Sequence, residues 1–267
     1  MITPISYNYS NPTFNANLKS PKLQFSQKDF FIKIRGYGRN ITWANQVKKT
    51  ADAAVYMIRK KDEPEEVLKL VTKGVTAANR YPLDLEKRLK TGILRTFREG
   101  WECGRDREIG TPYSIGRYKL YADRLDKVHE TPLKCKDEKL GMSKPEKYRQ
   151  IHHGEAKDIN YSLNYIFSLY KDKFSKYISK TADPEDLNDI NDIIAEIRWV
   201  MAHATPWLRG SDAISNVFMR ALYKSVGVKA YPPAKGISFD MEAYCTNLDD
   251  YKRNFPSYFE KPPVVIE

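Results

Sequence analysis

Two helical patterns that meet at a short elbow, within residues 183–227, constrain the fold of this chain more than any other feature. In the first pattern, Asp183 suits an N-cap and Pro184 suits the first helical turn. The apolar residues that follow recur at intervals of three and four: Leu187, Ile190, Ile194, Ile197, Met201 and Ala204. This spacing predicts a buried core helix that ends near Thr205, because Pro206 disfavours helical backbone in the residue before it.

A second core helix is predicted directly after the elbow. Either Ser211 or Asp212 can cap its start, and Gly227 is placed to end it. Apolar residues again recur on one face between these points: Ile214, Val217, Phe218, Ala221, Leu222 and Val226. The connection between the two helices is therefore short.

The start of this second helix is also a candidate anion site. The first backbone N–H groups of a helix lack intrahelical acceptors and lie at the positive end of its dipole. Arg209 and Gly210 immediately precede the start, so we expect Arg209, Gly210, Ser211 and Asp212 to bind a phosphate. The same residues can equally form a plain turn between two core helices, and the sequence leaves both interpretations open.

The elbow resembles a degenerate Fic motif. In that family, His-Pro-Phe-x-Asp/Glu-Gly-Asn-Gly/Lys-Arg lies between two helices, and this chain has Thr-Pro-Trp-Leu-Arg-Gly-Ser at residues 205–211. Pro206, Trp207 and Gly210 fall on the proline, the aromatic residue and the first glycine. The elbow and its two helices, residues 183–227, are thus similar to those of a divergent Fic-like (Fido) protein, of the kind seen in AvrB-like bacterial effectors.

Other positions depart from the motif. Thr205 stands where the family has its catalytic histidine, the general base for a target hydroxyl. Either His203, two residues earlier, substitutes for that histidine, or the chain has lost this chemistry. The metal-binding acid, the asparagine, the second glycine and the terminal arginine of the motif are replaced by Arg209, Ser211, Asp212 and Ala213.

The resemblance implies a transferase that moves a nucleotide- or sugar-derived group from a nucleotide donor to a protein hydroxyl. His203 and Thr205 would be the catalytic residues, and Arg220 would join residues 209–212 in binding the donor. A nucleotide or nucleotide sugar and a host protein target are the implied partners. No structural metal is expected.

The charge distribution suggests a second, non-enzymatic function. The chain carries 45 Lys and Arg residues against 34 Asp and Glu, and its densest basic and aromatic stretch runs from Lys87 to Lys127. Glycines interrupt the stretch, so we expect a loop in its middle, and we expect Arg117 and Tyr118 to bind substrate. The stretch can instead be a solvated surface, or the surface with which a helical module binds nucleic acid or an acidic protein.

Cysteine and histidine spacing argues against a disulfide framework or a metal site. The three cysteines are far apart, and His152 and His153 are adjacent, so on a helix they would point about 100° apart. No run of 18 apolar residues indicates a membrane span, and the first residues do not resemble a Sec signal peptide. We therefore expect a cytoplasmic protein, or one secreted without a Sec signal.

The whole pattern predicts a mainly α fold: one multi-helix, Fic-like bundle with at most one small β-hairpin. Residues 1–28 are predicted to be a disordered leader, similar in composition to uncleaved secretion signals. A helical domain follows at 29–256, with a boundary between two lobes at 131–155, and a surface tail is expected at 257–267. Outside the elbow, helices are predicted over 41–60, 63–80, 83–101 and 158–178.

Overall fold

The computed structural model describes residues 25–30, 41–79, 89–97, 100–102, 112–137, 139–140, 142–146, 150–178 and 182–266. Within these ranges the fold is mainly α, which confirms the predicted fold class. Strands form two short antiparallel sheets, so the prediction of at most one small β-hairpin was wrong. No helix in the described part of the chain has both the length and the apolar character that a membrane crossing needs.

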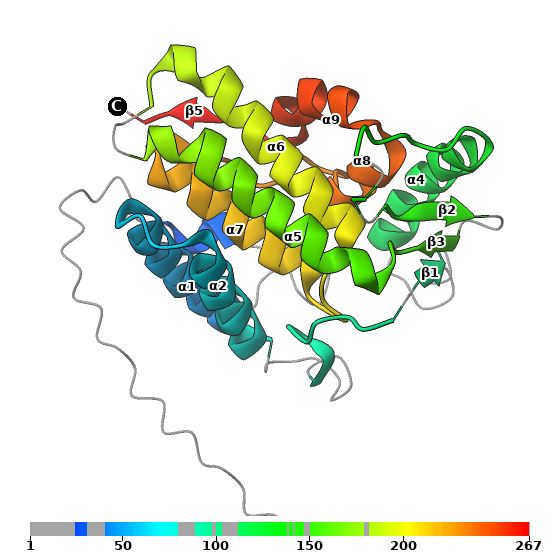
Figure 1. Cartoon of the computed structure of the whole chain (residues 1–267), viewed down its shortest axis with the longest axis horizontal. Coiled ribbons are helices and arrows are strands. Elements are labelled where there is room, and N and C mark those ends of the chain that lie inside the picture. The colour runs from blue at the N-terminus through cyan, green and yellow to red at the C-terminus, as the bar shows by residue number, and fades with distance from the viewer. Residues whose placement is uncertain are drawn as a thin grey trace, which may run out of the picture.

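Two N-terminal helices form one side of the molecule. The helix α1 (Ile41–Arg59) packs against α2 (Pro64–Ala78), and both contact α7 (Ser211–Ser225), as Figure 1 shows. The buried face of α1 has the spacing that the sequence predicts: Trp43, Val47, Ala51, Ala54, Val55 and Ile58. Because these residues leave water together, they anchor this helical pair to the core.

The core is centred on the helix α6 (Leu187–Ala204), which is buried on almost all sides from Ile190 onwards. A short 3-10 turn, η8 (Pro184–Asp186), leads into α6, and Asp183 and Asp186 form a capping box at its start. The predicted helix over 158–178 is also present. It runs as η5 (Ala156–Asp158), α5 (Ile159–Ser168), a π-helical segment η6 (Leu169–Phe174) and η7 (Ser175–Tyr177).

A small three-stranded sheet and the helix α4 (Pro112–Glu130) lie together at one end of the molecule (Figure 1). The strands β1 (Gly100–Glu102), β2 (Lys144–Glu146) and β3 (Gln150–His152) are arranged in the order β1-β3-β2, and all neighbours are antiparallel. Two of them fall within 131–155, where we predicted a lobe boundary.

The C-terminal residues complete the core. They form β4 (Val228–Lys229), α8 (Phe239–Cys245), α9 (Leu248–Asn254), η9 (Phe255–Tyr258) and β5 (Val264–Val265), which pairs with β4. Tyr258 and Phe259 are buried, and their rings contact those of Tyr251 and Phe255. The predicted surface tail at 257–267 therefore begins too early, because the buried aromatic cluster extends beyond residue 256.

The predicted leader likewise extends too far. Phe25 and Phe30 are each only 6% exposed, and the 3-10 turn η2 (Gln27–Phe30) packs against α1. Residues 25–28, predicted to be disordered, are thus part of the packed structure. Residues 1–24 lie outside the described residues.

The predicted helix over 83–101 is wrong in its second half. Leu89 and Lys90 are helical, but residues 91–95 run beside the elbow, and residues 100–102 form β1. Gly92 has φ +76°, a left-handed conformation that helps the chain leave the helical path. The apolar spacing of this stretch reflects a mixture of buried and exposed positions, since Ile93, Leu94 and Phe97 are exposed.

Candidate functional site

The elbow between α6 and α7 has the short form that the sequence predicts. Thr205 ends α6 in a left-handed conformation with φ +40°, which is unusual for a β-branched residue. Gly210 precedes α7 with φ +88°, and a Cβ atom there would lie 3.0 Å from the side chain of Thr91. The elbow thus has strained backbone at Thr205 and needs glycine at its other end.

Residues 91–95 clamp the elbow by backbone hydrogen bonds. The N–H of Gly92 donates to Arg209 O (3.1 Å), the N–H of Leu208 to Ile93 O (2.9 Å), and the N–H of Arg95 to Pro206 O (2.8 Å). These contacts are not local in the sequence, so the elbow depends on a segment that precedes it by more than a hundred residues.

The buried side chain of Arg95 reinforces this clamp. It is 1% exposed and donates to the carbonyl oxygens of Ala204 (2.8 Å) and Thr205 (3.1 Å) at the end of α6. A cation is favourable at a helix C-terminus, where unpaired carbonyls accumulate. Arg95 belongs to the predicted basic stretch, but it holds the elbow in place and is not part of a solvated surface.

Two of the predicted phosphate-binding residues also stabilise the elbow. Ser211 Oγ accepts from the N–H of Trp207 (3.2 Å) and donates to the carbonyl of Trp207 (3.1 Å). The carboxylate of Asp212 pairs with the buried guanidinium of Arg198 at 2.5 Å. Arg198 thereby takes up the negative charge of Asp212 at the start of α7.

Arg198 binds a second carboxylate as well, that of Asp240, at 2.5 Å. Burial acts to lower the pKa of Arg198, but the charges of Asp240 and Asp212 outweigh this effect and raise it. Burial raises the pKa of Asp240 to about 6 despite the nearby Arg198, and the charge of Asp212 adds to this effect. The guanidinium of Arg198 is therefore shared between Asp212 and Asp240, and the pKa is raised at Asp240, the more buried of the two acids.

Arg209, the residue on which the predicted phosphate site depends, is exposed. Within the described residues, its guanidinium has neither a hydrogen bond nor an ion pair, and the N–H groups of residues 211–213 have no acceptor. A cation in front of a helix start opposes the helix dipole, and a bound anion would reverse that penalty. The side chain of Arg209 remains available for a ligand.

His203, the predicted general base, has no nitrogen to offer a substrate. It is 1% exposed, its Nδ1 accepts from the N–H of Ser143 (3.2 Å), and its Nε2 lies 3.0 Å from the carbonyl of Ala243. Burial lowers its pKa to about 4. His203 is therefore a neutral packing residue between Trp199 and Tyr244.

Arg220, predicted to bind the donor, is also occupied within the protein. Its side chain is 6% exposed, donates to the carbonyl of Ala230 (3.0 Å) and pairs with Asp29 at 3.4 Å. Its guanidinium also lies over the ring of Phe30 at 5.1 Å. It fastens the N-terminal segment to α7, roughly 14 Å of helix away from Ser211. Arg117 and Tyr118 lie in α4, but their side chains are outside the described residues.

The structure places His153 beside the elbow, a contact that the sequence does not predict. His153 follows β3 directly and is 8% exposed, and its Nδ1 lies 3.1 Å from Thr205 Oγ1. Burial and the charges of Arg95 and Arg209, with smaller effects from His152 and His203, lower its pKa to about 3. Residues 153 and 205 are separated by 52 positions, so no local spacing could have predicted this contact.

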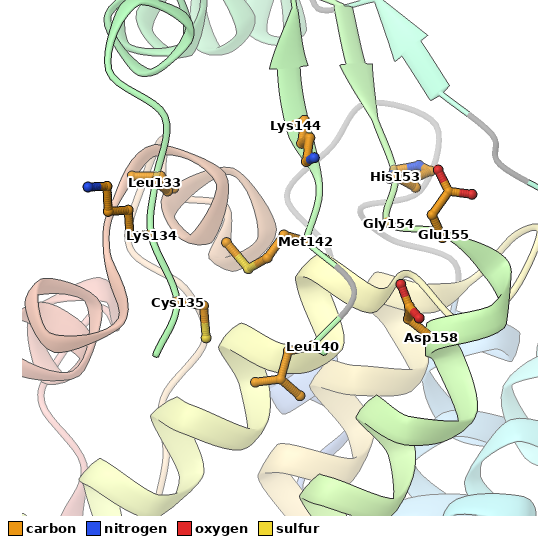
Figure 2. A pocket seen from close by; sticks show the side chains of 10 residues that line it. All are labelled: Leu133, Lys134, Cys135, Leu140, Met142, Lys144, His153, Gly154, Glu155 and Asp158. Carbon is orange, nitrogen blue, oxygen red and sulfur yellow. The ribbon is translucent and has the colours of Figure 1, made fainter. Parts of the chain in front are cut away.

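A pocket of about 490 Å³ opens beside His153. Figure 2 shows His153, Glu155 and Asp158 along one wall and mainly apolar side chains, with Lys134 and Lys144, along the other: Leu133, Cys135, Leu140 and Met142. The volume suits a small ligand or the side chain of a bound peptide. Among the described residues, no cluster of three or more His, Cys, Asp or Glu side chains could hold a metal ion.

A family model of avirulence proteins, AvrB_AvrC, matches residues 113–262 of the 267-residue chain. The chain belongs to the AvrB/AvrC family of avirulence proteins. This is a family of AvrB-like bacterial effectors, and the match contains α4 from residue 113 onwards, the elbow, His153 and the pocket. None of the curated proteins matches the chain.

Proposed function

We propose that this AvrB/AvrC protein is a Fic-like transferase that acts on a host protein. In this proposal, Arg209 and the start of α7 bind the phosphates of a nucleotide or nucleotide-sugar donor. A nucleotide- or sugar-derived group then moves from the donor to a hydroxyl of the host target. Membership of an effector family supports a host target.

The observation that carries the proposal is the exposed guanidinium of Arg209 beside the N–H groups at the start of α7, for which the described structure shows no acceptor. Arg209 is exposed and has no partner in the described structure, whereas Asp212, at the start of α7, is paired with Arg198. The N–H groups of residues 211–213 and the guanidinium are therefore suited to bind an anion together. The leaving phosphate of a donor would be stabilised there as it takes up negative charge.

A thermal-shift screen of nucleoside diphosphates and nucleotide sugars tests the proposal directly. A ligand present at 100 times its dissociation constant stabilises the folded protein by about 2.7 kcal/mol. The variant Arg209→Ala should lose this stabilisation. Arg253→Ala is the matched control, because it removes an exposed arginine from α9, outside the elbow.

The same screen separates this proposal from the non-enzymatic alternative. A basic binding module would bind oligonucleotides with an affinity that falls steeply with salt, and it would show no preference among nucleotides. If no nucleotide stabilises the wild-type protein, or if Arg209→Ala binds as well as the wild type, the transferase proposal is refuted.

A further inference from the structure

The imidazole of His153 is held by two hydroxyl groups. Its Nδ1 lies 3.1 Å from Thr205 Oγ1 and 3.5 Å from Ser143 Oγ. Thr205 Oγ1 donates its own proton to the carbonyl of Ala202 (2.8 Å), and Ser143 Oγ donates to the carbonyl of His203 (3.0 Å). Because both hydroxyl protons are used elsewhere, Nδ1 must supply the hydrogen in its contacts with these oxygens.

This assignment fixes the other nitrogen of the ring. When the neutral imidazole carries its proton on Nδ1, Nε2 has a free lone pair. Nothing in the described part of the structure pairs with Nε2, and the atom is not sealed within the core. His153 lines the pocket and its Nδ1 is held by Thr205 and Ser143, so we infer that Nε2 is the nitrogen that a molecule in the pocket can reach.

We propose that Nε2 of His153 accepts the proton of the acceptor hydroxyl that enters the pocket, and that Thr205 and Ser143 are positioning residues that keep the ring in this tautomer. The inference rests on the proposed transferase function and identifies its base. His153 thus provides the imidazole that the Fic motif would have at position 205, and it does so from a distant part of the sequence.

The step is a simple displacement. The O–H bond of the acceptor breaks, and its proton goes to Nε2. The oxygen forms a bond to the electrophilic atom of the transferred group, while the bond from that atom to the donor phosphate breaks. The phosphate leaves with the electron pair and is stabilised beside Arg209.

The charges around His153 keep it neutral before the donor binds. The pKa of His153 is lowered to about 3 by burial and by the cations near the elbow. A phosphate beside Arg209 would offset one of these positive charges, so donor binding would raise the pKa and strengthen the base. The charged and titratable groups around the ring are Arg95, Arg209, His152 and His203, with Glu155 and Asp158 on the same pocket wall.

NMR spectra of the histidine tautomers test which ring nitrogen of His153 carries the proton, and they need no activity assay. The full-length protein is labelled with ¹⁵N-histidine, and long-range ¹H–¹⁵N NMR spectra are recorded at pH 7. We expect His153 in the Nδ1–H form and His203 in the opposite, Nε2–H form, with His153→Gln used to assign the signals. An Nε2–H tautomer or a charged ring at His153 overturns the proposal, because no lone pair would then face the pocket.

Chemical modification tests whether the pocket reaches this nitrogen. Diethyl pyrocarbonate acylates unprotonated imidazole, and at pH 5 a histidine with an ordinary pKa of about 6.5 is mostly protonated. We expect His153 to react first among the four histidines. Thr205→Ala should produce a mixture of tautomers at His153, and Thr205→Ser should restore the single form. Absence of acylation at His153 contradicts the exposure of Nε2.

Slow hydrolysis of the donor, with water as the acceptor, provides the kinetic test. The donor is the nucleotide or nucleotide sugar that gives the largest thermal shift, and the variants are His153→Gln and its neighbour control His152→Gln. We expect His153→Gln to bind the donor normally and to hydrolyse it about 100-fold more slowly or worse. Unchanged hydrolysis overturns the role of His153. By contrast, a wild-type protein that binds no donor refutes the proposed function itself.

Discussion

One arginine, Arg209, precedes α7 and another, Arg220, lies in its C-terminal half, and the surroundings of the two guanidinium groups are opposite. Arg220 is buried near the C-terminal end of α7, where Asp29, the carbonyl of Ala230 and the ring of Phe30 surround it. Arg209 stands in front of the N-terminus, exposed and without a partner in the described structure. The comparison shows that a charged residue near a core helix identifies a binding site only when the protein leaves the charge unsatisfied.

The largest expected effect concerns the segment that closes over Arg220. Deletion of residues 1–30 removes Phe25, Asp29 and Phe30 together, and loss of a single buried phenylalanine side chain already costs about 3 kcal/mol or more. We expect the free energy of unfolding, measured in urea, to fall by more than about 4 kcal/mol. Deletion of residues 1–24 is the control and should leave it almost unchanged. Equal stability of the two truncated proteins would mean that the packing of η2 against the core adds nothing to the free energy of unfolding.

The next effect is that of Arg220 itself. Arg220→Ala leaves Asp29 without its cation and opens a gap beneath Phe30. We expect a loss of about 3 kcal/mol in the free energy of unfolding, with donor binding unchanged in the folded protein. A loss below about 1 kcal/mol, or a specific loss of nucleotide binding, would contradict the structural role of Arg220.

A pH effect is expected from the ion network of Arg198, Asp212 and Asp240 near the N-terminus of α7. The pKa of Asp240 is raised in the folded protein to about 6, so its protonated form favours folding. This contribution is complete below the unfolded pKa of about 3.9 and is lost as the pH rises through 6. The wild-type protein should therefore lose stability relative to Asp240→Asn between pH 4 and 6, by at most about 1.4 kcal/mol per pH unit. Urea unfolding over this range measures the difference, and the control Asp250→Asn, an exposed change in α9, should show no such trend. A constant difference between wild type and Asp240→Asn would show that Arg198 neutralises both acids.

The smallest effect on stability is expected at Arg209. Arg209→Ala removes a cation that opposes the helix dipole, so the ligand-free protein should be unchanged or more stable by a few tenths of a kcal/mol. Differential scanning calorimetry with and without the best nucleotide measures both the stability and the ligand effect. A destabilisation of more than about 2 kcal/mol without ligand would mean that Arg209 is a structural partner like Arg220.

The parts of the fold that local spacing determines could be predicted from the sequence. The cap at Asp183, the apolar faces of α1 and α2 and the glycine before α7 all follow from neighbouring residues, and they are present in the structure. The second half of the predicted helix at 83–101 was wrong, because residues 91–95 pair with the elbow. That pairing is a tertiary effect that outweighs the local periodicity.

The candidate site could be predicted only in part, for the same reason. The elbow and Arg209 lie within one short stretch and share a single local pattern. His153 meets Thr205 only because β3 ends beside the elbow, and Arg95 reaches Ala204 and Thr205 from the 91–97 segment. Likewise, His203 and Arg220 have suitable side chains for a site, but their burial depends on α8 and on the N-terminal segment, which their own neighbours in sequence do not reveal.

The clamp of residues 91–95 on the elbow also has a consequence for the order of folding. Arg95 bonds to Thr205 across 110 residues, and closing so long a loop carries an entropic cost that local helix formation does not. On a ribosome, the clamp segment emerges long before the elbow exists. The α6–α7 hairpin can form from local contacts, but Thr205 would reach its strained conformation only when this hairpin docks on the waiting segment. Assembly of the elbow, and of the anion site proposed there, is thus a late event in folding. An N-terminal half made alone would contain the clamp without the elbow that it holds.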